Sequence, residues 1–371
     1  MTKTVTPVSF FLGANAKSGY RSLFSEAYSP YDGGTHYILK GGPGTGKSTL
    51  MKKCAAELEK RGLYVERALC SADPASLDAV LAPEIGFSVL DGTAPHTKDP
   101  VLPGVSEHLI DLSPAWDLSY LKEHSQAIAE LVRENKKEHA KCAEYLHLAS
   151  RAALDNTALC TRALERDKLI NFTKRLAKRE IPDKKGNNRK GRVSRRFLSA
   201  VSPDGIYVNF DTVTALCEKI VTVEDRYACC MPFIIEYLAD YAAERGYDVI
   251  ECSCPMLPES KPEHLFIPEL KICFFTENPY HYSLVDDNCI HASRFLDKAE
   301  LAAVKQKLAF NEKLKKDFIS EAVRRMSVAK LLHNELEDYY IKATDFSEVE
   351  RIGERVIESA KKTDAKSKQM C

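Results

Sequence analysis

The sequence predicts an α/β protein made of two copies of one domain, each with a parallel sheet and a long helical appendage. Two observations lead to this prediction. Short apolar runs alternate with amphipathic helical segments over residues 37–96, which is typical of a parallel sheet covered by helices. The same succession of motifs then returns in the second half of the 371-residue chain, at offsets of about 180 to 186 residues.

The first domain begins with a strand, a glycine-rich turn and a helix. Residues 37–40 are a short apolar strand that runs directly into the turn. The next helix has one apolar face, formed by Leu50, Met51, Cys54, Ala55 and Leu58. Gly62 follows its last turn, where a glycine commonly ends a helix. Further strands are predicted at residues 63–69 and 87–90, the second of which leads directly into Asp91.

A long region without helix breakers follows. Residues 115–181 contain no proline or glycine, so we expect a long helical hairpin or bundle over about 116–181. Residues 174–196 are strongly basic, and Gly186-Asn187-Asn188 inside them indicates a loop. We interpret this basic segment first as a flexible linker, second as a lid over phosphates and third as a nucleic-acid contact, because it lacks interleaved aromatic residues.

Matched strings in the two halves support the duplication. Residues 11–14 correspond to residues 197–200, and residues 83–85 correspond to residues 268–270. Residues 280–352 are again free of proline and glycine. We therefore predict one domain over residues 1–188 and a second over residues 189–371, with a second helical region at about 283–362.

Composition narrows the class of protein. A formal net charge of zero argues against a surface that coats nucleic acid or a membrane, and no apolar run approaches the roughly 18 residues of a membrane span. The N-terminus does not read as a secretory leader. Twelve scattered cysteines without paired zinc spacing read as reduced thiols in the core. We expect a cytoplasmic protein without a membrane anchor.

The glycine-rich turn carries the clearest chemical signal. It fits the phosphate-loop pattern G-x-x-x-x-G-K-[ST] at every position, and Thr49 continues it into the helix: Gly41, Gly42, Pro43, Gly44, Thr45, Gly46, Lys47 and Ser48. Glycines let backbone N–H groups surround phosphates, and the helix N-terminus adds partial positive charge. Lys47 is expected to reach the β and γ oxygens, and Ser48 to bind Mg²⁺. We predict binding of a magnesium–nucleoside triphosphate, with ATP favoured.

Acidic residues after the predicted strands are the other site candidates. Asp91 ends its strand where the second Mg²⁺-holding residue of such sites is found. Asp73 follows residues 63–69 at the edge where open α/β sheets bind ligands, and we assign it a catalytic role together with Lys47 and Asp91. Asp78, expected on a short helix, and His96, in a loop, are weaker candidates.

The chain resembles the uncharacterised bacterial tandem P-loop ATP-binding proteins. The resemblance covers almost the whole chain and rests on residues 37–49, 70–78, 90–96 and 336–340. It implies nucleotide binding on a duplicated P-loop fold, without an established reaction.

The second half departs from that family, in which both halves commonly carry a phosphate loop. The corresponding segment is Asp225–Pro232, with Met231 in the place of Lys47 and Pro232 in the place of Ser48. The residue that corresponds to Asp91 in the second half is Glu277 or Thr276. We therefore expect the second copy to keep the fold without a working phosphate loop.

Three functional hypotheses remain open. An ATPase with one active site in the first half ranks first. A non-catalytic ATP sensor or scaffold, which binds a protein partner or a second copy through its long helices, ranks second. A phosphotransferase acting on a nucleotide or another small molecule ranks third, because a phosphate loop alone does not distinguish water from another acceptor.

Overall fold

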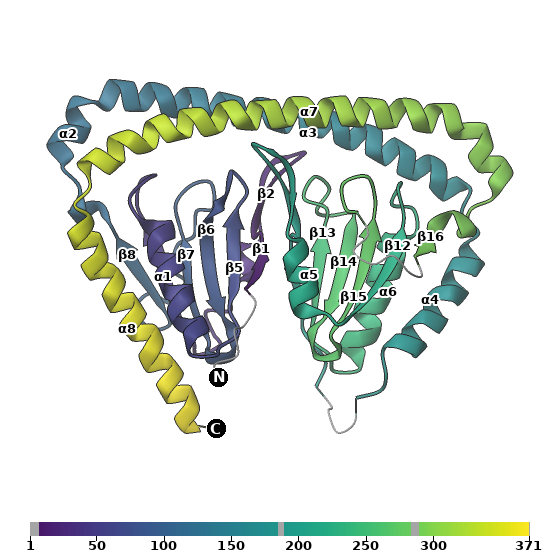
Figure 1. Ribbon diagram of the computed structural model, residues 1–371, viewed down its shortest axis with the longest axis horizontal. Helices are drawn as coiled ribbons and strands as arrows, with labels where there is room; N and C mark the ends of the chain where they lie inside the picture. Colours follow the sequence, from purple (N-terminus) through teal and green to yellow (C-terminus); the bar gives the residue numbers. More distant parts are fainter. Residues whose placement is uncertain (1–6, 185–188, 283–288, 371) are drawn as a thin grey trace.

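The computed structural model describes residues 7–184, 189–282 and 289–370, which form two sheet-and-helix halves beneath a pair of long helices (Figure 1). The first half has a six-stranded sheet. Its strands lie in the order β1 (Val8–Phe10), β5 (Glu66–Cys70), β6 (Asp73–Ala82), β7 (Phe87–Asp91), β4 (Thr35–Lys40) and β8 (Glu107–Asp111). β6 runs antiparallel to both of its neighbours, whereas the other pairs are parallel. The prediction of a parallel sheet is wrong in this respect, because the sheet is mixed.

The second half has the same topology. Its strands lie in the order β9 (Val193–Arg196), β13 (Val249–Ser253), β14 (Pro262–Ile267), β15 (Ile272–Glu277), β12 (Lys219–Glu224) and β16 (Ile290–His291), with β14 antiparallel to its neighbours. Each half also has a two-stranded hairpin: β2 (Gly13–Ala16) with β3 (Gly19–Ser22), and β10 (Ser199–Ser202) with β11 (Gly205–Val208). The arrangement is that of a duplicated α/β unit.

Strand β6 is the element that the sequence reading missed. Its residues from Leu77 to Ala82 are all buried, since neighbouring strands and packed layers cover both faces. A fully buried strand shows no alternation of polar and apolar residues, and Asp73-Pro74 reads as a turn. Asp78 therefore lies on a strand and not on a short helix.

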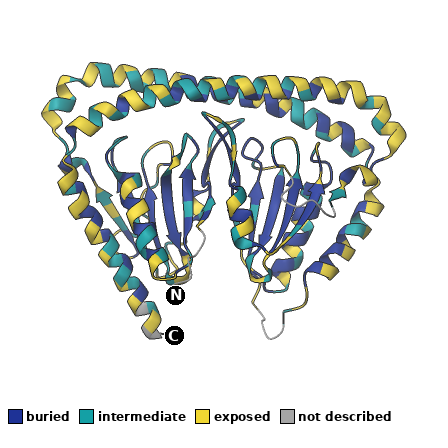
Figure 2. Ribbon diagram, in the orientation of Figure 1, coloured by how far each residue is buried: buried dark blue, intermediate teal, exposed yellow. Residues whose placement is uncertain are grey.

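Helix α1 (Lys47–Lys60) and its counterpart α6 (Met231–Glu244) pack on their sheets. The predicted apolar face of α1 is confirmed, since Leu50, Met51, Cys54, Ala55 and Leu58 are all buried. Figure 2 shows that the sheets form the buried centre of each half. Within the described residues the cysteines are free thiols, mostly buried, and no helix there is long and apolar enough to cross a membrane.

The long helices connect the halves. α2 (Leu118–Glu123), α3 (Ser125–Arg162) and α4 (Arg166–Glu180) follow the first sheet, and α5 (Phe210–Leu216), α7 (Lys298–Ala343) and α8 (Phe346–Met370) belong to the second half of the sequence. Short 3₁₀ turns lie at Phe24–Glu26, Pro83–Ile85, Ser113–Ala115, Pro268–Leu270 and Ala292–Phe295. α3 and α7 run side by side over both sheets (Figure 1).

The expected helical hairpin within each half is not formed. α3 pairs with α7 instead of folding back on α4, and hydrogen bonds from Asn135 to Ala329 and from Asn156 to Leu308 show that the pair is antiparallel. As a result α4 packs on α6 in the second half, and α8 packs on α1 in the first half. In each half, the helix that lies on the sheet is thus packed against a helix from the other half of the sequence.

Paired backbone contacts relate the two halves. Phe11 and Phe197 exchange N–H···O bonds of 2.8 and 3.0 Å. Asp117 N donates to Ala343 O at 2.7 Å, and its counterpart Asp297 N donates to Ala163 O at 2.8 Å. Each of these contacts is thus repeated by the equivalent residues of the other half, as in a two-fold symmetric dimer whose subunits are joined into one chain.

Parts of the predicted boundaries lie outside the described residues. These are the domain boundary at residue 188, part of the basic segment at residues 185–188, and the expected start of the second helical region at residues 283–288. Of the remaining basic segment, residues up to Glu180 belong to α4 and Val193–Arg196 form β9. The Arg196 guanidinium is buried against Glu66, 2.9 Å away, and so joins the two halves.

Candidate functional site

The glycine-rich loop connects β4 to α1 at the carboxyl end of the first sheet's parallel strands. Gly44 and Gly46 have φ angles of 68° and 89°, which a residue with a side chain rarely adopts. α1 begins at Lys47 directly after Gly46. The loop therefore reverses the chain so that the N-terminus of a 14-residue helix opens beside the end of β4.

Lys47 and Asp91 meet beside this loop. The Lys47 ammonium donates hydrogen bonds to the carbonyl oxygens of Gly41 at 2.8 Å and Gly42 at 2.6 Å. It also lies 3.6 Å from Asp91 Oδ2. Asp91 reaches this position because β7 pairs with β4 in parallel, with Asp91 opposite Leu39. Both side chains are almost fully buried, so their attraction is poorly screened by water.

Ser48 points toward β6. Its hydroxyl oxygen accepts a hydrogen bond from the Leu77 N–H at 2.9 Å, which leaves a lone pair and its own proton for another partner. Asp91 Oδ1 accepts from the Thr93 N–H at 2.8 Å and from the Thr93 hydroxyl. Ser48 and Asp91 thus offer the oxygen donors that Mg²⁺ prefers.

A second acid, Asp78, lies close to this pair. Its Oδ1 is 3.7 Å from His96 Nε2, and the Tyr20 hydroxyl is 2.7 Å from His96 Nδ1. Asp78 Oδ2 is buried and has no hydrogen-bond partner among the described residues. Burial raises the pKa of Asp78 to about 6, with the neighbouring Asp91 charge adding to the rise and His96 and Lys47 opposing it. The structure therefore brings both weaker candidates, Asp78 and His96, to the same place as Lys47 and Asp91.

Asp73 has different surroundings. Its carboxylate is 3.1 Å from Lys330 Nζ on α7 and accepts a hydrogen bond from the Ser76 hydroxyl at 2.7 Å. Burial alone would raise the pKa of Asp73, but these two partners outweigh it and lower the pKa. Asp73 thus connects β6 to α7, and its proposed catalytic role stays a prediction.

The end of α7 and the start of α8 pack against the glycine loop, which the sequence reading did not foresee. A Cβ atom on Gly42 would lie 2.5 Å from ring carbons of Tyr340, and one on Gly44 would lie 3.0 Å from the Glu337 carbonyl oxygen. A Cβ on Gly46 would lie 3.1 Å from Val349. Nothing in the sequence indicated that residues 336–340 contact this loop. Glycine is required at position 42 by this packing, independently of any ligand.

The corresponding place in the second half is filled by the chain itself. α6 begins at Met231 as α1 begins at Lys47, and Ala228, the counterpart of Gly44, keeps a positive φ of 51°. The Asp225 carboxylate accepts hydrogen bonds from the N–H groups of Cys229 at 3.2 Å, Cys230 at 2.8 Å and Met231 at 2.7 Å. A side-chain anion therefore occupies the N-terminus of α6, where the first half has Gly41.

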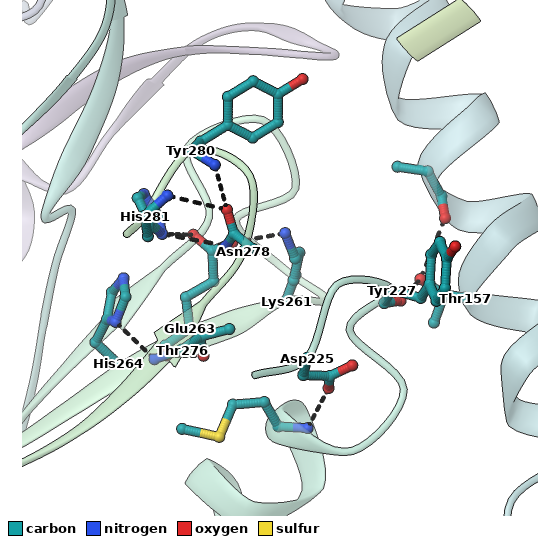
Figure 3. Close-up of polar contacts among 12 residues, drawn as sticks. Thr157, Asp225, Tyr227, Lys261, Glu263, His264, Thr276, Asn278, Tyr280 and His281 are labelled. Carbon is teal, nitrogen blue, oxygen red and sulfur yellow. Dashed lines mark hydrogen bonds and ion pairs between the residues drawn. The ribbon is translucent and has the colours of Figure 1, made fainter. Parts of the chain in front are cut away.

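The acid–histidine pair is also present in the second half. Glu263 lies on β14 as Asp78 lies on β6, and its Oε2 is 3.9 Å from His281 Nδ1 (Figure 3). Lys261 Nζ donates to Glu263 Oε1 at 2.6 Å, whereas Ser76 stands at the corresponding place in the first half. Burial would raise the pKa of Glu263, but Lys261 and the two nearby histidines hold that pKa at about 2.

Thr276 is the structural counterpart of Asp91. It pairs with Val223 across β15 and β12, as Asp91 pairs with Leu39, whereas Glu277 lies one residue further along. The second half consequently has no lysine at the position of Lys47 and no carboxylate at the position of Asp91. No protein-family model, curated protein or solved structure matches the chain.

Proposed function

We propose that the chain binds one magnesium–nucleoside triphosphate, ATP in preference, on the loop from Gly41 to Ser48 and hydrolyses it. The observation that supports this most directly is the junction of three groups. The Lys47 ammonium stands at the N-terminus of α1, beside a loop with two left-handed glycines and 3.6 Å from Asp91. A positive charge, a helix N-terminus and a carboxylate in this arrangement suit a triphosphate with its metal ion.

The residues present fit Mg²⁺ and phosphate by their donor chemistry. Ser48 and Asp91 provide hard oxygen ligands of the kind that Mg²⁺ takes. When bound, the metal ion would neutralise charge on the β- and γ-phosphate oxygens. Phosphate oxygens would replace the Gly41 and Gly42 carbonyls as acceptors for Lys47.

Asp78 supports hydrolysis over mere binding. A general base works best when its pKa is near the operating pH, and the pKa of Asp78 is raised to about 6. Its Oδ2 is buried and makes no hydrogen bond among the described residues, so a water that enters with the nucleotide would meet an unused acceptor there. We assign it the role of accepting the proton of the attacking water, with His96 and Tyr20 holding its position.

A nucleotide sensor is the second candidate function. The observation in its favour is the contact of Tyr340, Glu337 and Val349 with the loop glycines. Phosphates that reshape the loop would act on the corner between α7 and α8 and, through α7, on the second half. Such a protein would bind ATP without consuming it.

Product analysis separates these functions. Purified protein is incubated with Mg-ATP or Mg-GTP, with and without a panel of nucleosides and nucleotides. Hydrolysis predicts free phosphate and ADP, lost in Lys47→Ala and reduced at least a hundredfold in Asp78→Asn. The exposed Lys52 on α1 provides the matched control, Lys52→Ala. Bound but unchanged ATP would favour the sensor, and a phosphorylated acceptor would indicate a kinase.

A further inference from the structure

The second half encloses a cavity where it lacks the phosphate loop. The cavity has a volume of about 60 Å³, which is several times the minimum for one water molecule. It lies between the strand ends of the second sheet and the long helices: Lys261, Glu263 and Tyr280 line one side, and Glu312 and Lys315 of α7 line the other. Figure 3 shows Lys261, Glu263, His281 and Asn278 converging there, beneath Tyr280.

Cations outnumber carboxylates in this cavity. Its lining includes Lys261, Lys315 and Arg226, against Glu263 and Glu312. Lys315 is only 8% exposed, and burial lowers its pKa, while the nearby Glu312 opposes that shift. The imidazole of His281 adds no charge at neutral pH, because burial lowers its pKa. Asp225, the next acid, already accepts hydrogen bonds from the N–H groups of Met231, the first residue of α6, and of Cys229 and Cys230 just before it.

The two ammonium groups have spare hydrogen-bond donors, and Lys315 is buried whereas the Lys261 side chain is 22% exposed. Lys261 Nζ bonds to Glu263 at 2.6 Å and Lys315 Nζ bonds to Glu312 at 2.7 Å, one acceptor each among the described residues. An ammonium group carries three N–H donors, and a buried donor without an acceptor destabilises the folded state. A ligand rich in acceptors and carrying negative charge would satisfy both groups.

A metal ion is the alternative that the acid–histidine cluster suggests. Ligand atoms of Glu263, His264 and His281 all lie within 4.8 Å of one another. However, the Lys261 ammonium already holds the cation position beside Glu263. His264 Nδ1 accepts the Thr276 N–H at 3.2 Å, so its other nitrogen carries the proton and has no lone pair for a metal. The cluster is therefore not arranged to ligate a metal ion.

We propose that this cavity binds the oxyanion group, carboxylate or phosphate, of a small metabolite between Lys261 and Lys315. Tyr280, Met256 and Ile319 line the cavity as well and offer apolar contact to the rest of such a molecule. The site is distinct from the glycine loop and does not depend on the function proposed for that loop.

Calorimetric titration of the full chain tests the proposal. The protein carries Lys47→Ala, so that the glycine loop does not contribute, and is titrated separately with inorganic phosphate and with succinate. We expect one anion per chain in at least one titration, and the anion that binds identifies the acid group. Lys315→Met should weaken binding at least tenfold, whereas Lys316→Met, at an exposed position one residue further along α7, should not change it.

Two further measurements keep the test decisive if Lys315→Met does not fold. Lys261→Gln should weaken the same binding at least tenfold. Without any variant at the cavity, the bound anion should protect Lys261, but not Lys316, from an amine-reactive reagent followed by mass spectrometry. The proposal is overturned if neither phosphate nor succinate binds, or if the anion binds equally well to Lys315→Met and Lys316→Met. It is also overturned if the protein binds Mn²⁺ instead and Glu263→Gln abolishes that binding.

Discussion

The first turns of α1 and α6 are the most informative comparison in the molecule. Both helices have 14 residues, both follow a strand of the same topology, and both loops keep a left-handed residue at the same place, Gly44 or Ala228. They differ in what faces the helix N-terminus. In the first half Gly41 offers no side chain, while in the second the Asp225 carboxylate bonds to three N–H groups. The backbone arrangement thus survives in both halves, and in the second half a side-chain carboxylate fills the helix N-terminus.

The paired acids behind these helices differ in the same way. Asp78 and Glu263 occupy corresponding strands and each lies near a histidine. Burial raises the pKa of Asp78 to about 6, and no lysine lies within hydrogen-bonding distance to offset this rise, because Lys47 bonds to loop carbonyls. Glu263 has Lys261 at 2.6 Å, and its pKa falls to about 2. The neighbouring cation, more than the fold, determines the chemistry of each acid.

The largest effect on stability is expected from Asp225→Ala. Removing the carboxylate leaves three N–H groups at the start of α6 without their acceptor, and we expect a loss of about 3 kcal/mol in the free energy of unfolding. Urea unfolding measures it. Asp240→Ala, at an exposed position on the same helix, should change the free energy by less than about 0.5 kcal/mol. Equal effects of the two substitutions would mean that the carboxylate does not stabilise α6.

Glu263 should make the protein less stable in acid. Its folded pKa of about 2 lies below the unfolded value near 4.5, so its contribution is present above pH 4.5 and is lost as the pH falls toward 2. Between pH 5 and pH 3 this amounts to about 2 kcal/mol. Urea unfolding at both pH values measures the free energy of unfolding. Between pH 5 and pH 3 it should fall by about 2 kcal/mol less in Glu263→Gln than in the wild type. An unchanged pH dependence would contradict the ion pair with Lys261.

The ionisation of Asp78 should change the stability of the protein with pH in the opposite direction. Its folded pKa of about 6 lies above the unfolded value near 3.8, so the folded state binds more protons and stability falls as the pH rises through this window. We expect the wild type to lose about 2 kcal/mol between pH 4 and pH 7 through this group. Asp78→Asn should lack that loss, so its stability relative to wild type should increase with pH. A constant difference would mean that Asp78 is ionised throughout.

The smallest effect is expected from Asp73→Asn. Because Asp73 is held by Lys330 and Ser76, we expect the variant to reduce ATP turnover by only about threefold. Asp91→Asn should reduce it at least a hundredfold, because it removes a group beside Lys47. Steady-state kinetics on both variants distinguish the two acids. If Asp73→Asn lowers turnover as much as Asp91→Asn, then Asp73 belongs to the reacting groups.

The sequence predicted the features that depend on local patterns. Residue spacing predicted the loop between β4 and α1 and the buried face of α1. It also predicted that Met231 takes the position in the second half that Lys47 has in the first. Strand β6 did not, because a strand buried on both faces has no alternation to detect. The pairing of α3 with α7 was equally hidden, since a helix without proline or glycine does not indicate which helix it packs against.

Asp225 shows how a visible signal was misread. The segment from Asp225 to Pro232 was interpreted only as a lost phosphate loop. An aspartate a few residues before a helix is also a common way to satisfy free N–H groups, and that signal was in the sequence. Lys261 and Lys315 are 54 positions apart, and no local pattern brings them together. Only the three-dimensional arrangement shows that both line one cavity.

The stoichiometry of nucleotide binding tests the central claim most directly. Calorimetric titration of the full chain with Mg-ATP should give one nucleotide per chain, because Asp225 fills the helix N-terminus in the second half. The Lys47→Ala chain should bind none at the same concentrations, while Lys52→Ala should bind one with unchanged affinity. Two nucleotides per chain, one of which persists in Lys47→Ala, would contradict the account.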